Sequence, residues 1–344
     1  MTHTVTLIPG DGIGPAITEA TVRVLEAAGA PIEWDRQEAG SAAMERSGEP
    51  LPSETLEAIA RDRVALKGPL TTPIGAGFRS INVALRKHFD LYANVRPVRS
   101  LARGGRYDDI DLVIVRENTE GLYIGIEHFI GMEDDPRAVA ESVMLVTRYG
   151  AERIVRYAFE YALAHDRAKV TLVHKANILK CTQGLFLDVG REVAAEYEGR
   201  VAFDEKIIDN TAMQLVLDPY QFDVIVTENM FGDILSDEAA GLVGGLGFAP
   251  GANIGEDAAI FEPVHGSAPD IAGRGIANPC SCLLAACLML DHLDEPETAA
   301  RVRAGLESAL EAGEGLTPDL GGDGTTASFT DTILDHLSAR AGGS

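Results

Sequence analysis

The amino-acid sequence predicts an α/β protein in which helices cover both faces of a mainly parallel sheet. Two observations lead to this prediction. Apolar runs of strand length alternate with segments whose apolar residues recur at the helical period. The runs are continuously apolar rather than alternating, as is typical of strands that are buried on both faces.

The first strand is predicted at Val5–Ile8 and the first helix at residues 15–28. Pro15 occupies the first helical position and Gly29 follows the last one, as is common at helix ends. The apolar residues of one helix face are Ile17, Ala20, Val24, Leu25 and Ala28.

Strands are also predicted at Leu112–Val115, Val170–Val173 and Val224–Val226, and polar residues follow each of them directly. These include Arg116 after the first of the three and Lys175 after the second. Because open α/β sheets bind ligands beyond the carboxyl ends of their strands, we expect a ligand site there.

Length and composition restrict the class of protein. A chain of 344 residues can form two domains, and its net charge of −24 argues against a nucleic-acid or anionic-membrane partner. The N-terminus shows no signal peptide, so we expect a cytoplasmic location. The spacing of the four cysteines matches neither a zinc site nor a redox pair, and we interpret them as small buried side chains. They are Cys181, Cys280, Cys282 and Cys287.

A glycine-rich turn, Gly10-Asp-Gly-Ile-Gly14, joins the first strand to the first helix. A dinucleotide-binding loop has the spacing G-x-G-x-x-G, whereas this turn reads G-x-G-x-G. We therefore interpret it as a tight turn rather than a Rossmann-type phosphate cradle, and a nucleotide would have to bind through another loop.

Asp233 and Asp237 are four residues apart and would share one face of a helix. Like charges at this spacing cost roughly 0.2–0.5 kcal/mol, and a bound cation would remove that cost. Such oxygen ligands suit Mg²⁺ or Mn²⁺, with Asp209 as a third ligand if the fold brings it close. The alternative is that two acids in a first helical turn interact with the helix dipole.

Arg86, Arg96 and Arg116 are candidates for binding a small polyanion, although each alone could be an ordinary surface charge. An arginine at the edge of a core usually has an anionic partner, and Arg116 follows a strand that is predicted to be buried. A charge-assisted bond to a carboxylate contributes roughly 1.5–3 kcal/mol.

Three further residues have two interpretations each. Lys175 is either a general base, with its pKa lowered by burial and neighbouring cations, or one partner of a salt bridge. Tyr123 is either a proton donor or a packing residue. His265 lies in a loop of small residues that a flat ligand could approach closely, and it either contacts a ligand or is a hydrogen-bonded structural residue.

Six segments, taken together, resemble the β-decarboxylating dehydrogenases of hydroxy acids. This family includes isocitrate, homoisocitrate, 3-isopropylmalate and tartrate dehydrogenases. The segments occur in the family's order, and the resemblance extends over essentially the whole chain. They are residues 7–15 (LIPGDGIGP), 90–97 (DLYANVRP), 116–123 (RENTEGLY), 174–177 (HKAN), 232–237 (GDILSD) and 262–273 (EPVHGSAPDIAG).

The resemblance implies the two-domain α/β fold of this family, which is not a Rossmann fold. The large, cofactor-side domain would comprise residues 1–91 and 245–344. The small domain would comprise residues 92–244 and carry an arm, at about 121–147, that clasps the second protomer of a homodimer. In this homodimer, Lys175 and Asp209 would reach into the active site of the neighbouring protomer.

The resemblance also implies that the substrate is isocitrate. Ser80 and Asn82 match positions that contact the carboxylate by which isocitrate differs from its analogues, and Arg86, Arg96 and Arg116 would bind carboxylates. Such a site would reject the apolar group of 3-isopropylmalate by roughly 10⁴-fold or more, but one extra methylene in homoisocitrate is worth only about 1–3 kcal/mol. Homoisocitrate dehydrogenase, then 3-isopropylmalate dehydrogenase, are therefore alternatives, as is a non-catalytic regulatory subunit.

Asp270 and Ile271 bear on the cofactor, because NADP-dependent relatives carry a lysine–tyrosine pair there. An aspartate accepts hydrogen bonds from ribose hydroxyls and repels a 2′-phosphate, so we expect NAD. The residues that the resemblance assigns to NAD are Thr72, His265, Gly266, Ser267, Ala268, Asp270, Ile271 and Asn278.

The implied reaction is the oxidative decarboxylation of isocitrate to 2-oxoglutarate and CO₂, with NAD and Mg²⁺ or Mn²⁺. The metal would be held by Asp233, Asp237 and the neighbouring protomer's Asp209. Lys175 of the neighbouring protomer would assist removal of the hydroxyl proton, and Tyr123 would protonate the enolate that remains after CO₂ loss.

Overall fold

The computed structural model describes residues 2–72, 80–101 and 105–341, and the chain divides into two compact units. The first unit comprises residues 1–89, 99–109 and 240–344, and the second comprises residues 90–98 and 110–239. Residues 99–109 and 240–244 thus belong to the first unit, whereas the small domain that we predicted includes them. The functional roles assigned to the two domains stay predictions.

The first unit is built on five strands in the order β2-β1-β3-β12-β11. The first four are parallel and β11 is antiparallel to β12. Because the strands are mostly parallel, their carboxyl ends face the same edge of the sheet. The bounds are β1 His3–Ile8, β2 Ile32–Arg36, β3 Val64–Lys67, β11 Pro250–Ile254 and β12 Ala259–Pro263.

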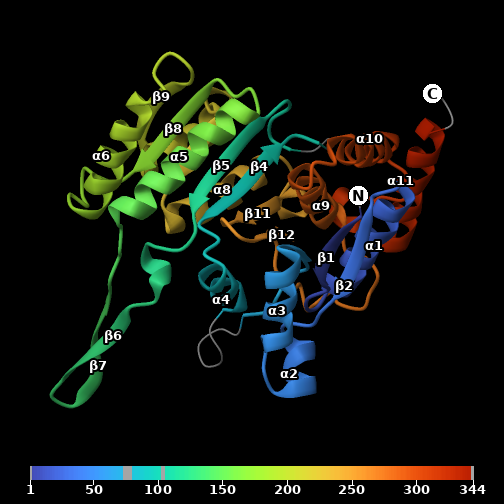
Figure 1. Cartoon of the computed structure of the whole chain (residues 1–344), viewed down its shortest axis with the longest axis horizontal. Coiled ribbons are helices and arrows are strands. Elements are labelled where there is room, and N and C mark those ends of the chain that lie inside the picture. Colours follow the sequence, from blue (N-terminus) through green and yellow to red (C-terminus); the bar gives the residue numbers. More distant parts are fainter. Residues whose placement is uncertain (1, 73–79, 102–104, 342–344) are drawn as a thin grey trace. The chain divides into compact units, whose positions relative to one another are not determined.

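Helices lie on both faces of these strands. Helix α9 packs against β3, β11 and β12 and contacts α1 and α10, while α3 packs against β1 and β3. Figure 1 shows α3 on the opposite side of the strands from α1 and α11. The helices of this unit are α1 Gly14–Ala27, α2 Ser41–Ser47, α3 Ser53–Asp62, α4 Ile81–His88, α9 Cys280–His292, α10 Pro296–Ala312 and α11 Thr326–Ala341, with 3₁₀ turns η3 Leu246–Phe248 and η4 Pro318–Leu320.

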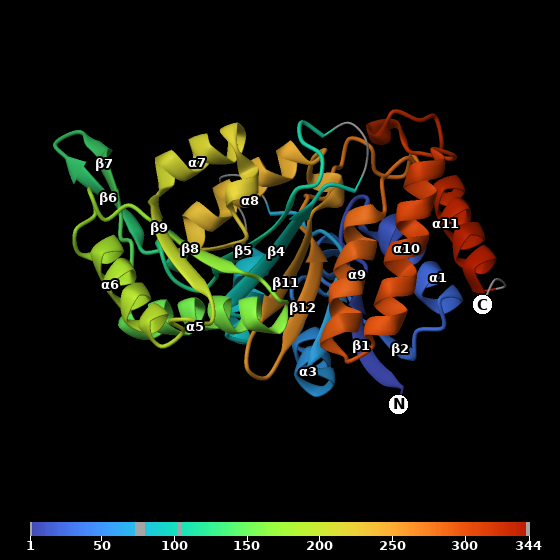
Figure 2. The same cartoon turned by 90° about the horizontal axis from the view of Figure 1, so that it is seen from above.

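The second unit is built on the strands β4-β5-β10-β8-β9, of which β5, β10, β8 and β9 are parallel. Helices α5 and α6 pack on one face and α7 and α8 lie on the other, as Figure 2 shows. The bounds are β4 Ala93–Arg99, β5 Asp111–Glu117, α5 Arg148–Ala164, β8 Lys169–His174, α6 Thr182–Ala195, β9 Ala202–Ile207, α7 Ile208–Leu217, β10 Val224–Thr227 and α8 Asn229–Leu242, with 3₁₀ turns η1 Leu122–Ile124 and η2 Pro219–Gln221.

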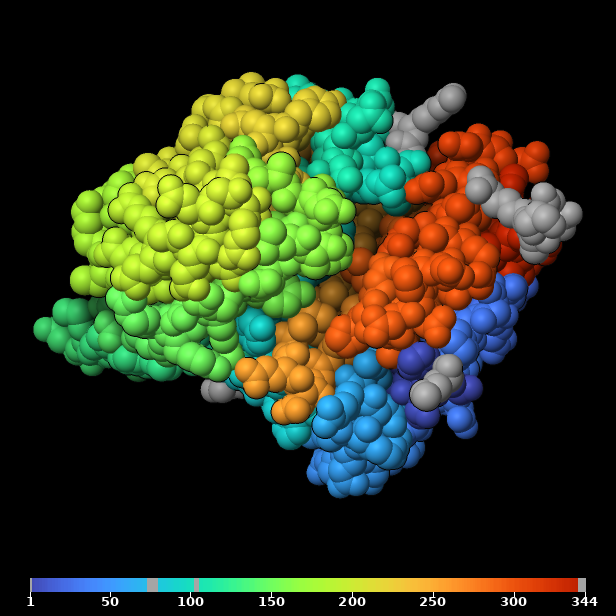
Figure 3. Space-filling model, turned by 45° about the horizontal axis from the view of Figure 1, so that its top comes forward, coloured from blue at the N-terminus to red at the C-terminus, as the bar shows by residue number. Residues whose placement is uncertain are grey.

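A two-stranded hairpin extends from the second unit (Figure 1). Its strands, β6 Glu127–Met132 and β7 Asp135–Ser142, are antiparallel and all of their residues are exposed. Figure 3 shows this hairpin, in dark green, at the margin of the unit. At its base, the backbone of Gly121 pairs with that of Leu145. The hairpin lies within the arm predicted at about 121–147.

The predicted α/β architecture and its first elements are confirmed. Helix α1 starts one residue before the predicted segment 15–28, and β1 contains Val5–Ile8. Three of the four cysteines are buried as predicted, but Cys181 is exposed because it precedes α6 at the surface. Among the described residues, no helix has both the length and the apolar character that crossing a bilayer requires.

The contact between α6 and β8 depends on a glycine. A Cβ atom on Gly190 would lie 2.0 Å from Cδ1 of Leu172, a side chain that is wholly buried. We predict that Gly190→Ala lowers the free energy of unfolding by about 1–3 kcal/mol, because a packed core cannot move aside. Gly184→Ala on the same helix meets nothing within 4 Å in the described structure and should raise stability by roughly 0.5–1 kcal/mol. Equal unfolding midpoints for the two variants would contradict this.

Candidate active site

Five of the predicted site residues lie together around the carboxylate of Asp233. The guanidinium groups of Arg116 and Arg96 both pair with Asp233 Oδ1, with an Arg96 Nη2–Oδ1 distance of 3.3 Å. The hydroxyl of Tyr123 donates to Asp233 Oδ2. Asp237 lies 3.5 Å from Arg96 Nη1. The second unit thus places two cations, a phenol and two carboxylates in one cluster.

The local structure explains how these side chains meet. Arg116 stands near the carboxyl end of β5, and Asp233 and Asp237 lie one turn apart on α8. The aliphatic part of Arg116 crosses α8 at Gly232, where a Cβ would come within 2.6 Å of Arg116 Cγ. Only glycine leaves space for the arginine to reach Asp233 at this point.

The dipole interpretation of Asp233 and Asp237 does not fit the structure. Helix α8 begins at Asn229, so both acids lie beyond the first turn, where the macrodipole has little effect. The N-terminus of α8 is instead capped by Glu228, whose carboxylate accepts from the backbone N–H groups of Met230 and Phe231. Partial desolvation raises the pKa of Asp237, more than the nearby charge of Arg96 lowers it.

Lys175 and Asp209 form a separate ion pair in the same unit. Lys175 Nζ bonds to Asp209 Oδ1, and this hydrogen bond lowers the pKa of Asp209. Asp209 does not join Asp233 and Asp237, since the described part of the chain holds no group of three acids, histidines or cysteines placed to bind a metal. Within one chain, the predicted metal ligands are therefore incomplete.

In the first unit, Arg86 belongs to a buried ionic group that the sequence analysis did not identify. Glu262 at the end of β12 pairs with Lys67 Nζ at 2.6 Å and with Arg86 Nη2 at 3.4 Å, and it accepts a hydrogen bond from Asn253 at 2.8 Å. Burial alone would raise the pKa of Glu262, but the charges of Lys67 and Arg86 outweigh it and lower the pKa to about 2.

The predicted substrate segment lies on α4 beside this group. Ser80 immediately precedes the helix, and its Oγ accepts a hydrogen bond from Thr72 at 3.3 Å. Among the described residues, Asn82 Oδ1 and Arg86 Nε are buried without a hydrogen-bond partner. A buried polar atom without a partner is unfavourable, so a polar group brought to either atom would lower this cost.

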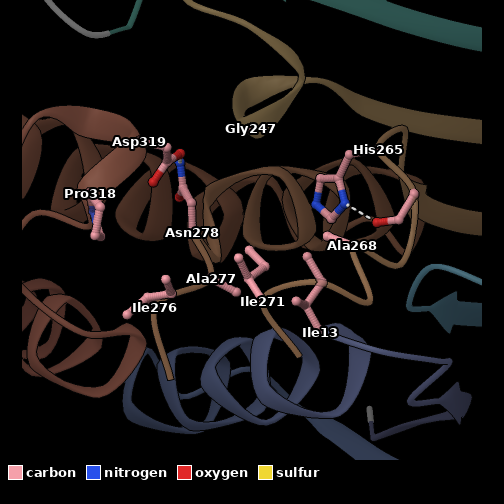
Figure 4. A pocket seen from close by; sticks show the side chains of 11 residues that line it. Ile13, Gly247, His265, Ala268, Ile271, Ile276, Ala277, Asn278, Pro318 and Asp319 are labelled. Atoms are coloured by element: carbon pink, nitrogen blue, oxygen red, sulfur yellow. Dashed lines mark hydrogen bonds between the residues drawn. The ribbon is translucent and has the colours of Figure 1, made fainter. Parts of the chain in front are cut away.

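A cavity of about 490 Å³ opens in the first unit near the loop 265–273. Of the predicted cofactor residues, His265, Gly266, Ala268, Ile271 and Asn278 line it, and Thr72, Ser267 and Asp270 do not. Burial lowers the pKa of His265, which keeps its ring neutral. Figure 4 shows its Nδ1 bonded to the carbonyl of Gly266 at 3.0 Å.

The sequence analysis missed other residues that line this cavity, among them Ile13, Gly247, Pro318 and Asp319. Asp319 accepts a hydrogen bond from Asn278 Nδ2 at 2.9 Å. Residues 318–319 lie in a short 3₁₀ turn far along the chain, and only the fold brings them to the loop 265–273.

Ile13 of the glycine-rich turn lines the cavity, and the turn is bonded to the loop that contains His265. Gly10 and Gly12 have positive φ angles, and a Cβ on Gly12 would lie 2.0 Å from the carbonyl oxygen of Ser267. The backbone N–H of Ile13 donates to that same oxygen at 2.9 Å. The turn therefore fixes the loop that contains His265, which agrees with its interpretation as a tight turn.

Comparison with known proteins places these features in a family context. A model described as isocitrate/isopropylmalate dehydrogenase matches residues 4–333. The mitochondrial NAD isocitrate dehydrogenase catalytic subunit 5 of Arabidopsis thaliana is 49% identical, and the match covers 97% of this chain and 88% of the relative. A mitochondrial protein of Dictyostelium discoideum, named as a regulatory subunit of NAD isocitrate dehydrogenase, is 46% identical over 97% of this chain and 91% of its own. The crystal structure of isocitrate dehydrogenase from Methylococcus capsulatus matches with a TM-score of 0.94 and 55% identity over 98% of this chain and 99% of that one.

The comparisons overturn one prediction. Curated relatives at 45–49% identity are mitochondrial subunits, so the predicted cytoplasmic location was wrong. That prediction rested on the start of the chain alone.

The ionic group around Glu262 makes a specific prediction about pH. The pKa of Glu262 falls from 4.5 to about 2 on folding. The contribution of this carboxylate to the free energy of unfolding, roughly 3 kcal/mol, is therefore complete above pH 4.5 and is lost as the pH falls towards 2. The difference in unfolding free energy between wild type and Glu262→Gln should therefore shrink by about 2 kcal/mol from pH 7 to pH 3. Urea unfolding measures it, with the exposed Glu19→Gln as control. A pH-independent difference would exclude this charge interaction.

Proposed function

The chain belongs to the isocitrate/isopropylmalate dehydrogenase family, and on this premise we propose that it is a catalytically active NAD-dependent isocitrate dehydrogenase. The reaction class follows from relatives that are NAD isocitrate dehydrogenase subunits. The observation that carries the catalytic proposal is the cluster around Asp233, which brings Arg96, Arg116 and Tyr123 to one carboxylate.

A regulatory subunit is the alternative, since one relative of similar identity has that name. Identity alone therefore does not separate the two roles. The side chains do bear on the choice, because a chain without catalysis has no need to direct a tyrosine hydroxyl and two arginines at the same acid. Lys175 and Asp209, the other two groups that the reaction requires, also lie close to each other.

Each unit by itself carries groups that suit the carboxylates or polar groups of isocitrate. Arg96 and Arg116 would exchange their bonds to Asp233 for bonds to carboxylates of isocitrate, which are equally anionic. In the first unit, Arg86 Nε and Asn82 Oδ1 would gain the polar partner that they lack, with Ser80 adjacent. An isopropyl group would leave both atoms unsatisfied, which favours isocitrate over 3-isopropylmalate.

The residues present fit a divalent metal when a second chain contributes one ligand. Asp233 and Asp237 supply oxygen donors on one helix face, and Asp237 is more than half exposed. Asp209 of a neighbouring protomer would complete the set. Mg²⁺ or Mn²⁺ there would act as a Lewis acid on the oxygen at the reacting carbon.

The chain's own residues supply the proton transfers. Lys175 of the neighbouring protomer would assist removal of the proton from the substrate hydroxyl as hydride leaves for NAD. After CO₂ is lost, Tyr123 would donate its proton to the carbon of the enolate. The hydroxyl of Tyr123 already points at Asp233, and the Arg116 guanidinium lies 5.2 Å from its ring.

The assignments of Lys175 and Asp209 require a homodimer. The β6–β7 hairpin exposes Phe129, Ile130, Met132 and Val139, and an isolated two-stranded hairpin is only marginally stable in water. Helix α7 exposes Met213, Val216 and Leu217. Exposed apolar groups of this kind mark association surfaces. Both lie in the unit that also carries Lys175 and Asp209.

The cavity in the first unit is the proposed NAD site, with His265, Ile271 and Asn278 in its wall. Asp270 is not a lining residue but precedes Ile271 in the chain, and its carboxylate would accept hydrogen bonds from a ribose. None of the lining residues is a lysine or arginine that could hold a 2′-phosphate, and Asp319 adds a carboxylate. This charge balance favours NAD over NADP.

The first experiment follows NADH formation by the purified chain with Mn²⁺ and equal concentrations of isocitrate, homoisocitrate or 3-isopropylmalate. We expect the highest kcat/KM for isocitrate, and NAD preferred to NADP. Preference for homoisocitrate would overturn the substrate assignment but leave the family chemistry. Absence of turnover with all three substrates would contradict the proposed catalytic activity and favour a regulatory subunit.

Shared active sites predict complementation between inactive variants. Lys175→Ala and Asp233→Ala homodimers should each be nearly inactive, because every site lacks one group. After refolding together at equal amounts, about half of the dimers should be hybrids with one intact site, which gives about a quarter of wild-type activity. A mixture of Asp233→Ala and Asp237→Ala is the matched control. Both residues would come from the same protomer in each site, so a hybrid dimer would have no intact site. Recovery in the control, or none in the first mixture, contradicts the shared site.

A further inference from the structure

We propose that Asn229 is a positioning residue that holds the guanidinium of Arg116 in the orientation required to bind substrate. This inference rests on the proposed function, and it assigns a role to a residue that neither the motifs nor the chemistry required. Asn229 is fully buried at the first position of α8.

The contact between the two residues uses two nitrogens of the arginine. Arg116 Nε and Nη2 donate to the same oxygen, Asn229 Oδ1, at 3.1 and 2.7 Å. Two donors on one acceptor fix the rotation of the planar guanidinium, which a single bond would not. The remaining nitrogen, Nη1, is thereby directed at Asp233.

The other half of the amide holds a second part of the site. Asn229 Nδ2 donates to the carbonyl oxygen of Glu120 at 3.1 Å, three residues before Tyr123. The Glu120 carboxylate in turn accepts from the backbone N–H of Thr147 at 2.9 Å and from its hydroxyl. One side chain therefore links the anion-binding arginine to the segment that carries the tyrosine and to the base of the arm.

A purely structural role would be helix capping, and the structure assigns that role elsewhere. Glu228 accepts from the N–H groups of the first turn of α8, so the Asn229 amide is not needed there. Its oxygen and nitrogen are directed at Arg116 and Glu120 instead. A buried amide whose bonds join two site segments is expected to affect substrate binding more than stability.

The test is the Asn229→Ala variant. A hydrogen bond to a charged group is worth roughly 1.5–3 kcal/mol, so KM for isocitrate should rise roughly tenfold to hundredfold. The isocitrate dissociation constant, measured by calorimetry with Mn²⁺, should rise in parallel. KM for NAD should stay unchanged, because the residues proposed to bind NAD belong to the other unit.

Two further variants separate positioning from general damage. In an Arg116→Lys background, which lacks the planar fork, Asn229→Ala should change KM for isocitrate less than threefold, because the partner of the amide is already lost. Thr227→Ala is the stability control. Its hydroxyl bonds to the Val173 carbonyl on β8, so it should lower the unfolding midpoint and leave KM for isocitrate within twofold of wild type.

The outcomes distinguish the two proposals. If the wild type turns over isocitrate, two results would overturn the positioning role alone. One is an Asn229→Ala variant whose KM for isocitrate equals that of wild type, and the other is an effect of Asn229→Ala that adds fully to that of Arg116→Lys. A wild type that neither binds nor oxidises isocitrate would overturn the proposed function, and this inference with it.

Discussion

The constraint on which the second unit depends is the burial of Arg116. Only 1% of this side chain is exposed, and a buried guanidinium requires both a counter-charge and partners for its N–H groups. Helix α8 supplies a counter-charge and a hydrogen-bond acceptor: Asn229 accepts two of the bonds, Asp233 compensates the charge, and Gly232 leaves space for the aliphatic stem. The start of α8 and the end of β5 therefore form one substructure, and a substitution in either alters the contacts of the other.

The first unit uses the same principle with the signs reversed. There a buried carboxylate, Glu262, is compensated by Lys67 and Arg86, and Asn253 completes its hydrogen bonds. Lys67 and Asn253 both bond to Glu262. Arg86 pairs with the same carboxylate through Nη2, and its Nε has no hydrogen-bond partner among the described residues. Each unit thus holds a buried arginine in place through a carboxylate, and an amide completes the hydrogen bonds of the group.

The sequence predicted the architecture well, because continuous apolar strands and helical periodicity are local signals that tertiary packing reinforces. It also singled out Asp233 and Lys175, and the structure pairs each of them with a side chain of opposite charge. It did not identify Glu262 and Asn229 as partners of arginines, since these contacts join positions far apart in the chain. Asp319 was missed for the same reason. It lies in a turn after α10, and only the fold places it in a cavity wall with residues of the loop 265–273.

The pairing within one chain suggests how ligands would be coupled under the proposed function. Asp233 is held by two arginines and a tyrosine, so a cation has to compete with them for its oxygens. Carboxylates of the substrate would bind the arginines and thereby release Asp233, and a metal on Asp233 would in turn free the arginines for the substrate. Each ligand would then lower the free-energy cost of binding the other, and this coupling is reciprocal by thermodynamic necessity. In the pair of Lys175 and Asp209, the lysine bonds to one carboxylate oxygen, so a metal bound by Asp209 would compete with the lysine for that oxygen.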